Sequence, residues 1–314
     1  MRIVIALGGN ALLRRGESPE AATQTTRLAL IAPALASLAR QHQVVIVHGN
    51  GPQIGLLARE STNDRDLVSP YPLAALGAET QGLIGSLLEQ ALHNAGLTSP
   101  IVALVSHTIV AVDDPAFLAP SKPIGAVYNR WHAQRLARSH GWTIAPDGGG
   151  WRRVVASPRP RHIVELETGR TILASGGTVI MGGGGGIPLT DDHGYSPVDG
   201  VIDKDYTAAL IAEELDADLL VILTDVAGVL ADFGTPQQRV IQATTPALLQ
   251  AISFPEGSMK PKVEAACTFT ESTGRRAAIG ALEDAEAIVR GTAGTQITST
   301  PTSLPNLNQP AMEA

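Results

Sequence analysis

Short runs of apolar residues alternate along this chain with segments whose apolar residues recur every three or four positions. The runs contain four or five residues, mostly β-branched residues or leucine, and lie at residues 3–7, 44–47, 101–105, 178–181 and 219–223. Continuous apolar runs bounded by turn residues predict strands buried on both faces of a parallel sheet. Helical spacing occurs at residues 23–39, 78–93, 206–215 and 262–272. This alternation predicts an α/β sandwich with right-handed crossovers.

One stretch, residues 112–167, interrupts the alternation. It contains six prolines, three consecutive glycines and all three tryptophans of the chain. We therefore expect one domain over residues 1–298 with an inserted lid at about 112–167, including a small hairpin around Trp151–Val155. Residues 299–314 are rich in Thr, Ser, Pro and Asn. This composition predicts a disordered tail.

Composition excludes several classes of protein. Among 314 residues, 23 are Lys or Arg and 30 are Asp or Glu, which gives a net charge of −7. An acidic protein with 4% aromatic residues lacks the basic surface and the stacking platforms of nucleic-acid binders. The single cysteine, Cys267, excludes an intrachain disulfide and a multi-thiolate zinc site. No apolar run reaches membrane-spanning length, and the N-terminus is too short for a signal peptide. We expect a cytoplasmic protein with no nucleic-acid or membrane partner.

Three glycine-rich turns follow predicted strands. They are Gly8-Gly9-Asn10, Gly49-Asn50-Gly51 and the run 182–186, which includes Gly183 and Gly184. Glycine lets backbone N–H groups approach an anion closely, and a helix that begins after the turn adds its positive end. Three such turns predict a phosphate-bearing ligand at the carboxyl ends of the strands. The alternative is that each glycine only shortens a turn between strand and helix. Walker, dinucleotide, zinc-protease and nucleophile-elbow motifs are absent from the sequence.

Lysine is scarce, since the 23 basic residues include only Lys122, Lys204, Lys260 and Lys262. Phosphoryl transfer needs compact cations beside the transferring group, and lysine is such a cation. Lysines confined to a few unusual positions therefore suggest cations for which arginine would not serve. Four solvated surface lysines in an arginine-rich protein are the alternative.

Two acidic segments lie near predicted strand ends and helix starts. In Asp203-Lys204-Asp205, Asp205 either caps the following helix or orients lysines by ion pairing. Thr224 and Asp225 end another buried strand, where they form a turn or line a nucleoside pocket.

No catalytic role is proposed for His48, Arg152 or Arg153. A lone histidine is more often structural than a base, so His48 is assigned no role. For Arg152 and Arg153, solvation of the lid is favoured over phosphate binding.

Fourteen short strings, in order over residues 3–297, resemble the carbamate kinases of the amino-acid kinase superfamily. They are ALGGNA at 6–11, HGNGPQ at 48–53, TQG at 80–82 with IG at 84–85, DPAF at 114–117, KPIG at 122–125, RRVV at 152–155 with SP at 157–158, GGGGIP at 183–188, VIDKD at 201–205, LTDV at 223–226, GSM at 257–259 with PK at 261–262, and GT at 294–295. Each string is weak alone, whereas the ordered set is specific to this family.

The resemblance implies an open three-layer αβα sandwich around a mainly parallel sheet, with a protruding lid and a homodimeric assembly. It implies reversible phosphoryl transfer between ATP and carbamate, giving ADP and carbamoyl phosphate. Carbamoyl phosphate is a high-energy mixed anhydride, so we expect the direction that forms ATP, and both arginine breakdown and purine-derived nitrogen breakdown are compatible with it. Mg²⁺ is expected to be held by the phosphates, with no metal ligands from the protein.

The resemblance also assigns roles, residue by residue. The catalytic residues would be Lys122, Lys204, Asp205 and Lys262. The residues that bind carbamate and the transferred phosphoryl group would be Gly8, Gly9, Asn10, Gly49, Asn50 and Gly51. The nucleotide-binding residues would be Gly183, Gly184, Thr224, Asp225, Gly257, Ser258 and Met259. Carbamate is already an anionic nucleophile, so this chemistry needs alignment and charge neutralisation and no general base.

Four positions depart from the family pattern. Lys260 replaces a usual glycine, Leu230 a frequent tyrosine and Ala156 a usual proline, while Gly150 lies near a common arginine. These departures bear on affinity more than on the type of reaction.

Two other functions stay open. One is a different small-acid kinase of the same superfamily, and the other is a catalytically silent nucleotide-binding sensor. The tight glycine loops favour a very small acceptor. The presence of Lys122, Lys204, Lys262 and Asp205 argues against the silent sensor.

Overall fold

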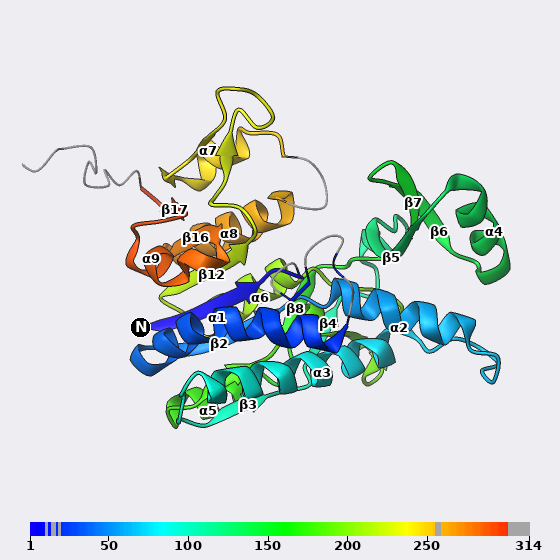
Figure 1. Ribbon diagram of the computed structural model, residues 1–314, viewed down its shortest axis with the longest axis horizontal. Helices are drawn as coiled ribbons and strands as arrows, with labels where there is room; N and C mark the ends of the chain where they lie inside the picture. Colours follow the sequence, from blue (N-terminus) through cyan, green and yellow to red (C-terminus); the bar gives the residue numbers. More distant parts are fainter. Residues whose placement is uncertain (10–11, 14–16, 18–19, 255–258, 301–314) are drawn as a thin grey trace, which may run out of the picture.

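A mainly parallel sheet forms the centre of the computed structural model, which describes residues 1–9, 12–13, 17, 20–254 and 259–300 (Figure 1). Within these residues eight strands pair in the order β15 (Ala243–Thr244), β17 (Thr295–Ile297), β16 (Arg276–Ala281), β12 (Leu219–Thr224), β1 (Arg2–Leu7), β2 (Gln43–His48), β9 (Thr178–Ile180) and β3 (Ile101–Ala103). Every neighbouring pair except β16–β17 is parallel. All five strands predicted from apolar runs are confirmed.

The central strands are apolar on both sides because helices cover both faces of the sheet. In the middle strand β1, Ile5 pairs with Ile46 of β2 and with Val221 of β12, and all three side chains are fully or almost fully buried. Alternate residues of β1 point to opposite faces, so Ile5 and Val4 belong to two different core clusters. Burial on both faces explains why these strands read as continuous apolar runs.

Helices on each face complete three layers (Figure 1). One cluster packs α1 (Ala21–Gln41), α3 (Leu73–Asn94) and α9 (Ala285–Arg290) against the sheet. The opposite cluster packs α5 (Leu166–Ala174), α6 (Lys204–Glu214) and α8 (Met259–Thr273). The αβα sandwich and the four helices predicted from spacing are confirmed. None of the helices in the described ranges is both long enough and apolar enough to cross a bilayer.

Smaller elements surround this core. A second sheet orders β11 (Ser196–Pro197), β10 (Ile187–Thr190), β4 (His107–Val110) and β8 (Pro160–Ile163). Near α7 (Pro246–Gln250), β13 (Leu230–Ala231) pairs with β14 (Arg239–Val240). Short 3₁₀ turns occur at η2 (Pro115–Phe117), η3 (Gly183–Gly185) and η4 (Leu282–Asp284).

The lid protrudes from one end of the body, at the right of Figure 1. It consists of β5 (Lys122–Tyr128), α4 (Arg130–His140), β6 (Thr143–Asp147) and β7 (Gly150–Val155), with strand order β5-β7-β6. The predicted hairpin is β6–β7. The protruding part covers residues 122–155 of the predicted span 112–167, because β8 pairs with β4 in the body. Residues 301–314 of the predicted tail lie outside the described residues.

The lid joins the body through a contact between two glycines. Helix α2 (Gly51–Asn63) carries Gly55, and a Cβ added there would lie 2.9 Å from both Cα and N of Gly125 in β5. Gly125 has φ +73°, a conformation that favours glycine. The neighbouring Ile124 is buried in a small cluster with Ile54 and Val201. Strand β5 is thereby placed with its first residue, Lys122, over the carboxyl ends of the body strands.

Substitution of Gly55 by alanine tests this contact. We expect Gly55→Ala to lower the free energy of unfolding by about 1–3 kcal/mol, because an overpacked core must shift backbone. The measurement is urea denaturation. The matched control is Gly82→Ala in α3, where an added Cβ meets nothing within 4 Å and the residue is exposed. Alanine should leave that variant unchanged or stabilise it by up to about 1 kcal/mol. Equal shifts in both variants would contradict the close contact.

Candidate functional site

A cavity of about 150 Å³ lies where the lid meets the carboxyl ends of the central strands. Its charged lining residues are Lys122, Asp203, Lys204, Asp205 and Lys262. Its loop residues include Gly49, Asn50, Gly51 and Gly184. Eight of the residues that the sequence placed in the site thus share one cavity, although they come from the lid, two glycine loops and two helices.

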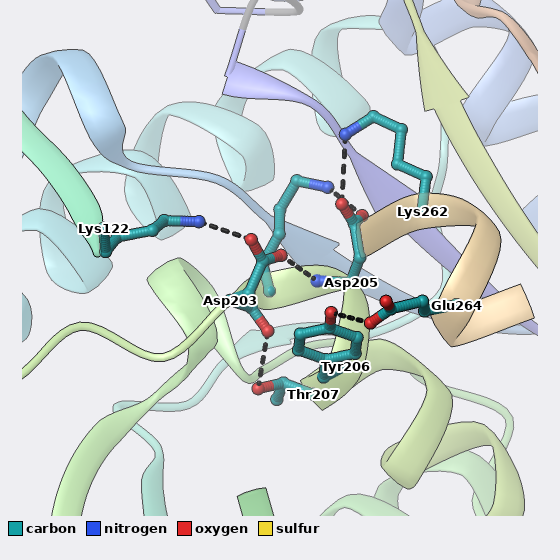
Figure 2. A network of polar contacts seen from close by, with 8 residues as sticks. Lys122, Asp203, Asp205, Tyr206, Thr207, Lys262 and Glu264 are labelled. Carbon is teal, nitrogen blue, oxygen red and sulfur yellow. Dashed lines mark hydrogen bonds and ion pairs between the residues drawn. The ribbon is translucent and has the colours of Figure 1, made fainter. Parts of the chain in front are cut away.

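Asp205 holds two lysines, one with each carboxylate oxygen (Figure 2). Lys204 is its neighbour in the first turn of α6 and donates to Oδ1. Lys262 reaches it from α8 and donates to Oδ2 at 3.0 Å. Asp205 is 2% exposed and Lys204 9% exposed, so this ion pair has little access to water.

The protonation states follow from burial and charge. Burial by itself would raise the pKa of Asp205, but the charges and hydrogen bonds of Lys204 and Lys262 outweigh it and hold that pKa well below its usual range. Burial opposes the charge on Lys262, yet Asp205 and Asp203 keep its pKa raised. Asp205 is therefore ionised at neutral pH.

A second ion pair connects the lid to the body. Lys122, at the start of β5, donates to Oδ2 of Asp203. Oδ1 of Asp203 accepts from the backbone N–H of Asp205 at 3.0 Å and caps α6. Helix capping, which the sequence offered as one role for Asp205, falls to Asp203 because Asp203 stands one residue before the helix. Asp205 takes the other role and orients lysines.

The charges of this cluster favour an anion. Three ammonium groups face two carboxylates, so one positive charge is in excess. The N-terminal end of α6, with its positive partial charge, lies in the same place. A cavity with this charge and size fits a phosphoryl-sized group.

The first two glycine loops touch one another beside Lys204. A Cβ added to Gly49 would lie 3.0 Å from N of Gly9 and 3.3 Å from Cδ of Lys204. Backbone bonds tie each loop to the neighbouring strand, from Gly8 N to Leu223 O at 3.0 Å and from Gly49 N to Leu7 O at 2.9 Å. Asn10 lies outside the described residues.

The five-glycine run packs against side chains on several sides. Four of its residues have positive φ. A Cβ on Gly184 would lie 2.2 Å from Nδ2 of Asn50, and one on Gly183 would lie 2.3 Å from Nε2 of His48. The run follows β9, which β1 and β2 separate from β12. Gly183 and Gly184 therefore lie beside the Gly49 loop, and β1 and β2 separate them from Thr224 and Asp225 at the end of β12.

The remaining predicted nucleotide residues lie at the end of β12 and the start of α8. Thr224 donates to Oδ1 of Asp225 at 3.1 Å, and the charge of Asp225 helps raise the pKa of Lys262. Met259 is the first residue of α8 and packs against the core. Gly257 and Ser258 lie outside the described residues.

His48 has a structural position in the site that the sequence did not reveal. It is 1% exposed, and its Nδ1 lies 3.1 Å from the carbonyl oxygen of Gly49. That oxygen can only accept, so Nδ1 carries the proton of a neutral ring. Burial, aided by the charge of Lys204, lowers the pKa of His48 to about 4. The only signal in the sequence was its place directly before the Gly49 loop.

The four departures from the family pattern lie outside the charged cluster. Gly150 has no room for a side chain, since a Cβ would lie 2.3 Å from Cγ1 of Val127. Lys260 lines a separate cavity of about 550 Å³. Leu230 pairs with Val240 in the β13–β14 hairpin, and Ala156 is buried beside Gly200.

The lid arginines make contacts away from the lysine cavity. Arg152 forms an ion pair with Asp147 at 2.8 Å. Arg153 is stacked over Trp142, with its Cζ 5.2 Å from the ring centroid. Neither lines the cavity of the three lysines. These contacts favour a structural role in the lid over a phosphate contact.

The described residues contain no group of three or more His, Cys, Asp or Glu placed to hold a metal ion. Both carboxylates of the cavity already neutralise lysines.

The sequence and the fold of this chain are similar to those of known kinases. The model of the "Amino acid kinase family" matches residues 1–281. A carbamate kinase from Haemophilus influenzae is 48% identical, with 95% of this chain and 97% of that protein covered. One from Escherichia coli K12 is also 48% identical, covering 94% and 98%. The solved structure of a carbamate kinase from Giardia lamblia bound to AMP-PNP has a TM-score of 0.85 and 35% identity, covering 95% and 98%.

The buried His48 predicts a loss of stability in weak acid. The unfolded histidine takes up a proton near pH 6.5, whereas the folded one resists protonation down to about pH 4, so falling pH favours unfolding over this window. From pH 7.5 to pH 5, wild type should lose about 2 kcal/mol relative to His48→Gln, whose side chain does not titrate.

Urea denaturation at the two pH values measures this difference. Replacement of the exposed His193 by glutamine is the control and should show no such change. If His48→Gln and wild type lose equal stability between the two pH values, the assignment of a buried, neutral His48 ring is wrong.

Proposed function

The chain belongs to the amino acid kinase family, in its carbamate kinase branch, and we propose that it transfers a phosphoryl group reversibly between ATP and carbamate at the cavity of the three lysines. One structural observation supports phosphoryl transfer at this site. Lys122, Lys204 and Lys262 converge from the lid, α6 and α8 on a space of about 150 Å³ beside two glycine loops. Such a space suits a small planar acceptor and one phosphoryl group.

The bond changes balance without a proton transfer. An anionic oxygen of carbamate attacks the γ-phosphorus of ATP, a new P–O bond forms, and the bond to the β-phosphate oxygen breaks. ADP leaves with that electron pair, and carbamoyl phosphate is the other product. In reverse, the ADP oxygen attacks carbamoyl phosphate and carbamate leaves. His48, neutral and bonded to the backbone, is not needed as a base.

The protein supplies alignment and charge. Lys204 and Lys262, fixed by Asp205, neutralise charge that builds on the phosphate oxygens in the transition state. Lys122 contributes from the lid. The two glycine loops hold the acceptor and the transferring group in this proposal, at Gly8, Gly9, Asn10, Gly49, Asn50 and Gly51. We add Gly184 to this acceptor side, since it packs on Asn50.

The nucleotide in this proposal lies along the end of β12 and the start of α8. Thr224, Asp225, Gly257, Ser258 and Met259 border it. The AMP-PNP complex of the Giardia lamblia relative supports a nucleotide in this fold. Mg²⁺, when bound through the phosphates, would neutralise part of their charge.

Several finer points stay predictions from the sequence. These are the ATP-forming direction, a place in arginine breakdown, the cytoplasmic location and the homodimer. The first of the two other functions is a kinase for a different small acid, and the small cavity disfavours an acid larger than carbamate. The intact lysine–aspartate cluster disfavours a silent sensor.

ATP formation from carbamoyl phosphate and ADP, coupled to hexokinase and glucose-6-phosphate dehydrogenase, tests the proposal. We expect turnover with carbamoyl phosphate and at least 100-fold lower kcat/KM with acetyl phosphate, which lacks the amino group. Equal rates would favour a different small-acid kinase, and no turnover with bound ADP would favour the sensor.

The lysine roles predict a large loss of turnover on truncation. Lys204→Ala and Lys122→Ala should each lower kcat by at least about 10²-fold, as when one transition-state donor is removed. Lys260→Ala is the matched control, because Lys260 lines a different cavity, and its kcat should stay within about two-fold of wild type. Near-normal kcat in both cavity variants would refute the assigned roles.

A further inference from the structure

Asp203 connects the start of α6 to the lid through one side chain. Its Oδ1 caps α6 by accepting from the N–H of Asp205, and its Oδ2 accepts from the lid ammonium of Lys122 (Figure 2). The two partners are fixed differently. The cap is local, whereas Lys122 lies 81 residues earlier in the chain and on another subdomain.

The position of Asp203 is itself rigid. The side chain is 11% exposed, and its carbonyl oxygen accepts from the N–H of Thr207 in the first turn of α6 at 3.2 Å. The Lys122 side chain is 30% exposed, so the lysine is the more accessible partner of this pair. A long lysine side chain gains rotamer entropy when it is released. A fixed carboxylate can offset that entropy and keep the ammonium in the cleft.

We propose that Asp203 is a positioning residue that holds Lys122 over the acceptor side of the cavity and keeps the lid closed before substrate binds. The inference rests on the proposed function, since it assigns the reason for holding that lysine. Lys122 then meets an incoming phosphoryl group without a search through its rotamers. The Gly55–Gly125 contact and Ile124 seat β5, and Asp203 directs the charged end of its first residue.

If Asp203 served only to cap α6, the position of the lid would not depend on the charge of Asp203. Asparagine caps helices about as well as aspartate but carries no charge. Asp203→Asn therefore keeps the cap and weakens the hold on Lys122. The matched control is Asp147→Asn, which removes a carboxylate that pairs with Arg152 inside the lid and leaves the contact between lid and body intact.

Tryptophan fluorescence of the full chain reports on the lid without any substrate. All three tryptophans, Trp131, Trp142 and Trp151, belong to the lid. Trp142 lines a cleft of about 630 Å³ between lid and body, shared with Leu73 and Asp199. Release of the lid should expose Trp142, so the Stern–Volmer constant for acrylamide should rise at least 1.5-fold in Asp203→Asn and stay at the wild-type value in Asp147→Asn.

Kinetics give the second measurement. In the ATP-forming direction, Asp203→Asn should raise KM for carbamoyl phosphate at least five-fold, because Lys122 must be ordered at the moment of binding. KM for ADP should stay within two-fold, since the proposed nucleotide side lies at β12 and α8. Asp147→Asn should change neither constant.

The outcomes separate the two proposals. Wild-type quenching and wild-type KM in Asp203→Asn would overturn the positioning role while leaving the kinase function intact. If the wild-type protein forms no ATP, the proposed function fails and quenching alone decides whether Asp203 holds the lid. If Asp203→Asn does not fold, Lys122→Met breaks the same pair from the lid side. Unchanged quenching in that variant would likewise overturn the inference.

Discussion

The ion pair between one buried carboxylate and two ammonium groups is the interaction on which this site depends. Two lysines placed close together repel one another, and burial adds the cost of removing each charge from water. Asp205 offsets both terms because each of its oxygens binds one lysine. Removal of Asp205 would leave two like charges in an almost dry cavity. The fold therefore brings the start of α6 and the start of α8 to a common point, and the net charge that remains is suited to an anion.

Glycine serves two different physical purposes around this cluster. At Gly9 and Gly49 the lack of a side chain lets two loops touch and leaves space for backbone N–H groups near Lys204. In the five-glycine run it permits positive φ angles and close packing under Asn50 and His48. The second purpose is structural, because the run packs closely against Asn50 of the second glycine loop. Proximity to glycine in the sequence alone does not distinguish a residue that contacts ligand from one that supports the contact.

The lid adds a charge that the body lacks. Lys122 comes from a separate three-stranded sheet, yet it ends beside Asp203 at the cap of α6. Lys122 belongs to the lid and is held in the cavity by Asp203, whereas Lys204 and Lys262 belong to the body. The cluster thus combines fixed charges, which need no reorganisation during transfer, with one charge that depends on how β5 is seated on α2.

Local patterns determined much of this protein. Continuous apolar runs at 3–7, 44–47 and 219–223 specify buried parallel strands, and the scarcity of lysine marked three residues that the fold brings together. Pairing across long separations was decided by tertiary structure. No repeating pattern of residues in the sequence predicts that Lys122 contacts Asp203, 81 residues away, or that Lys262 contacts Asp205, 57 residues away. The same holds for Gly183 and Gly184, whose side of the cleft depends on strand order, because the order of parallel strands is set by how crossover helices pack and not by residues near each turn.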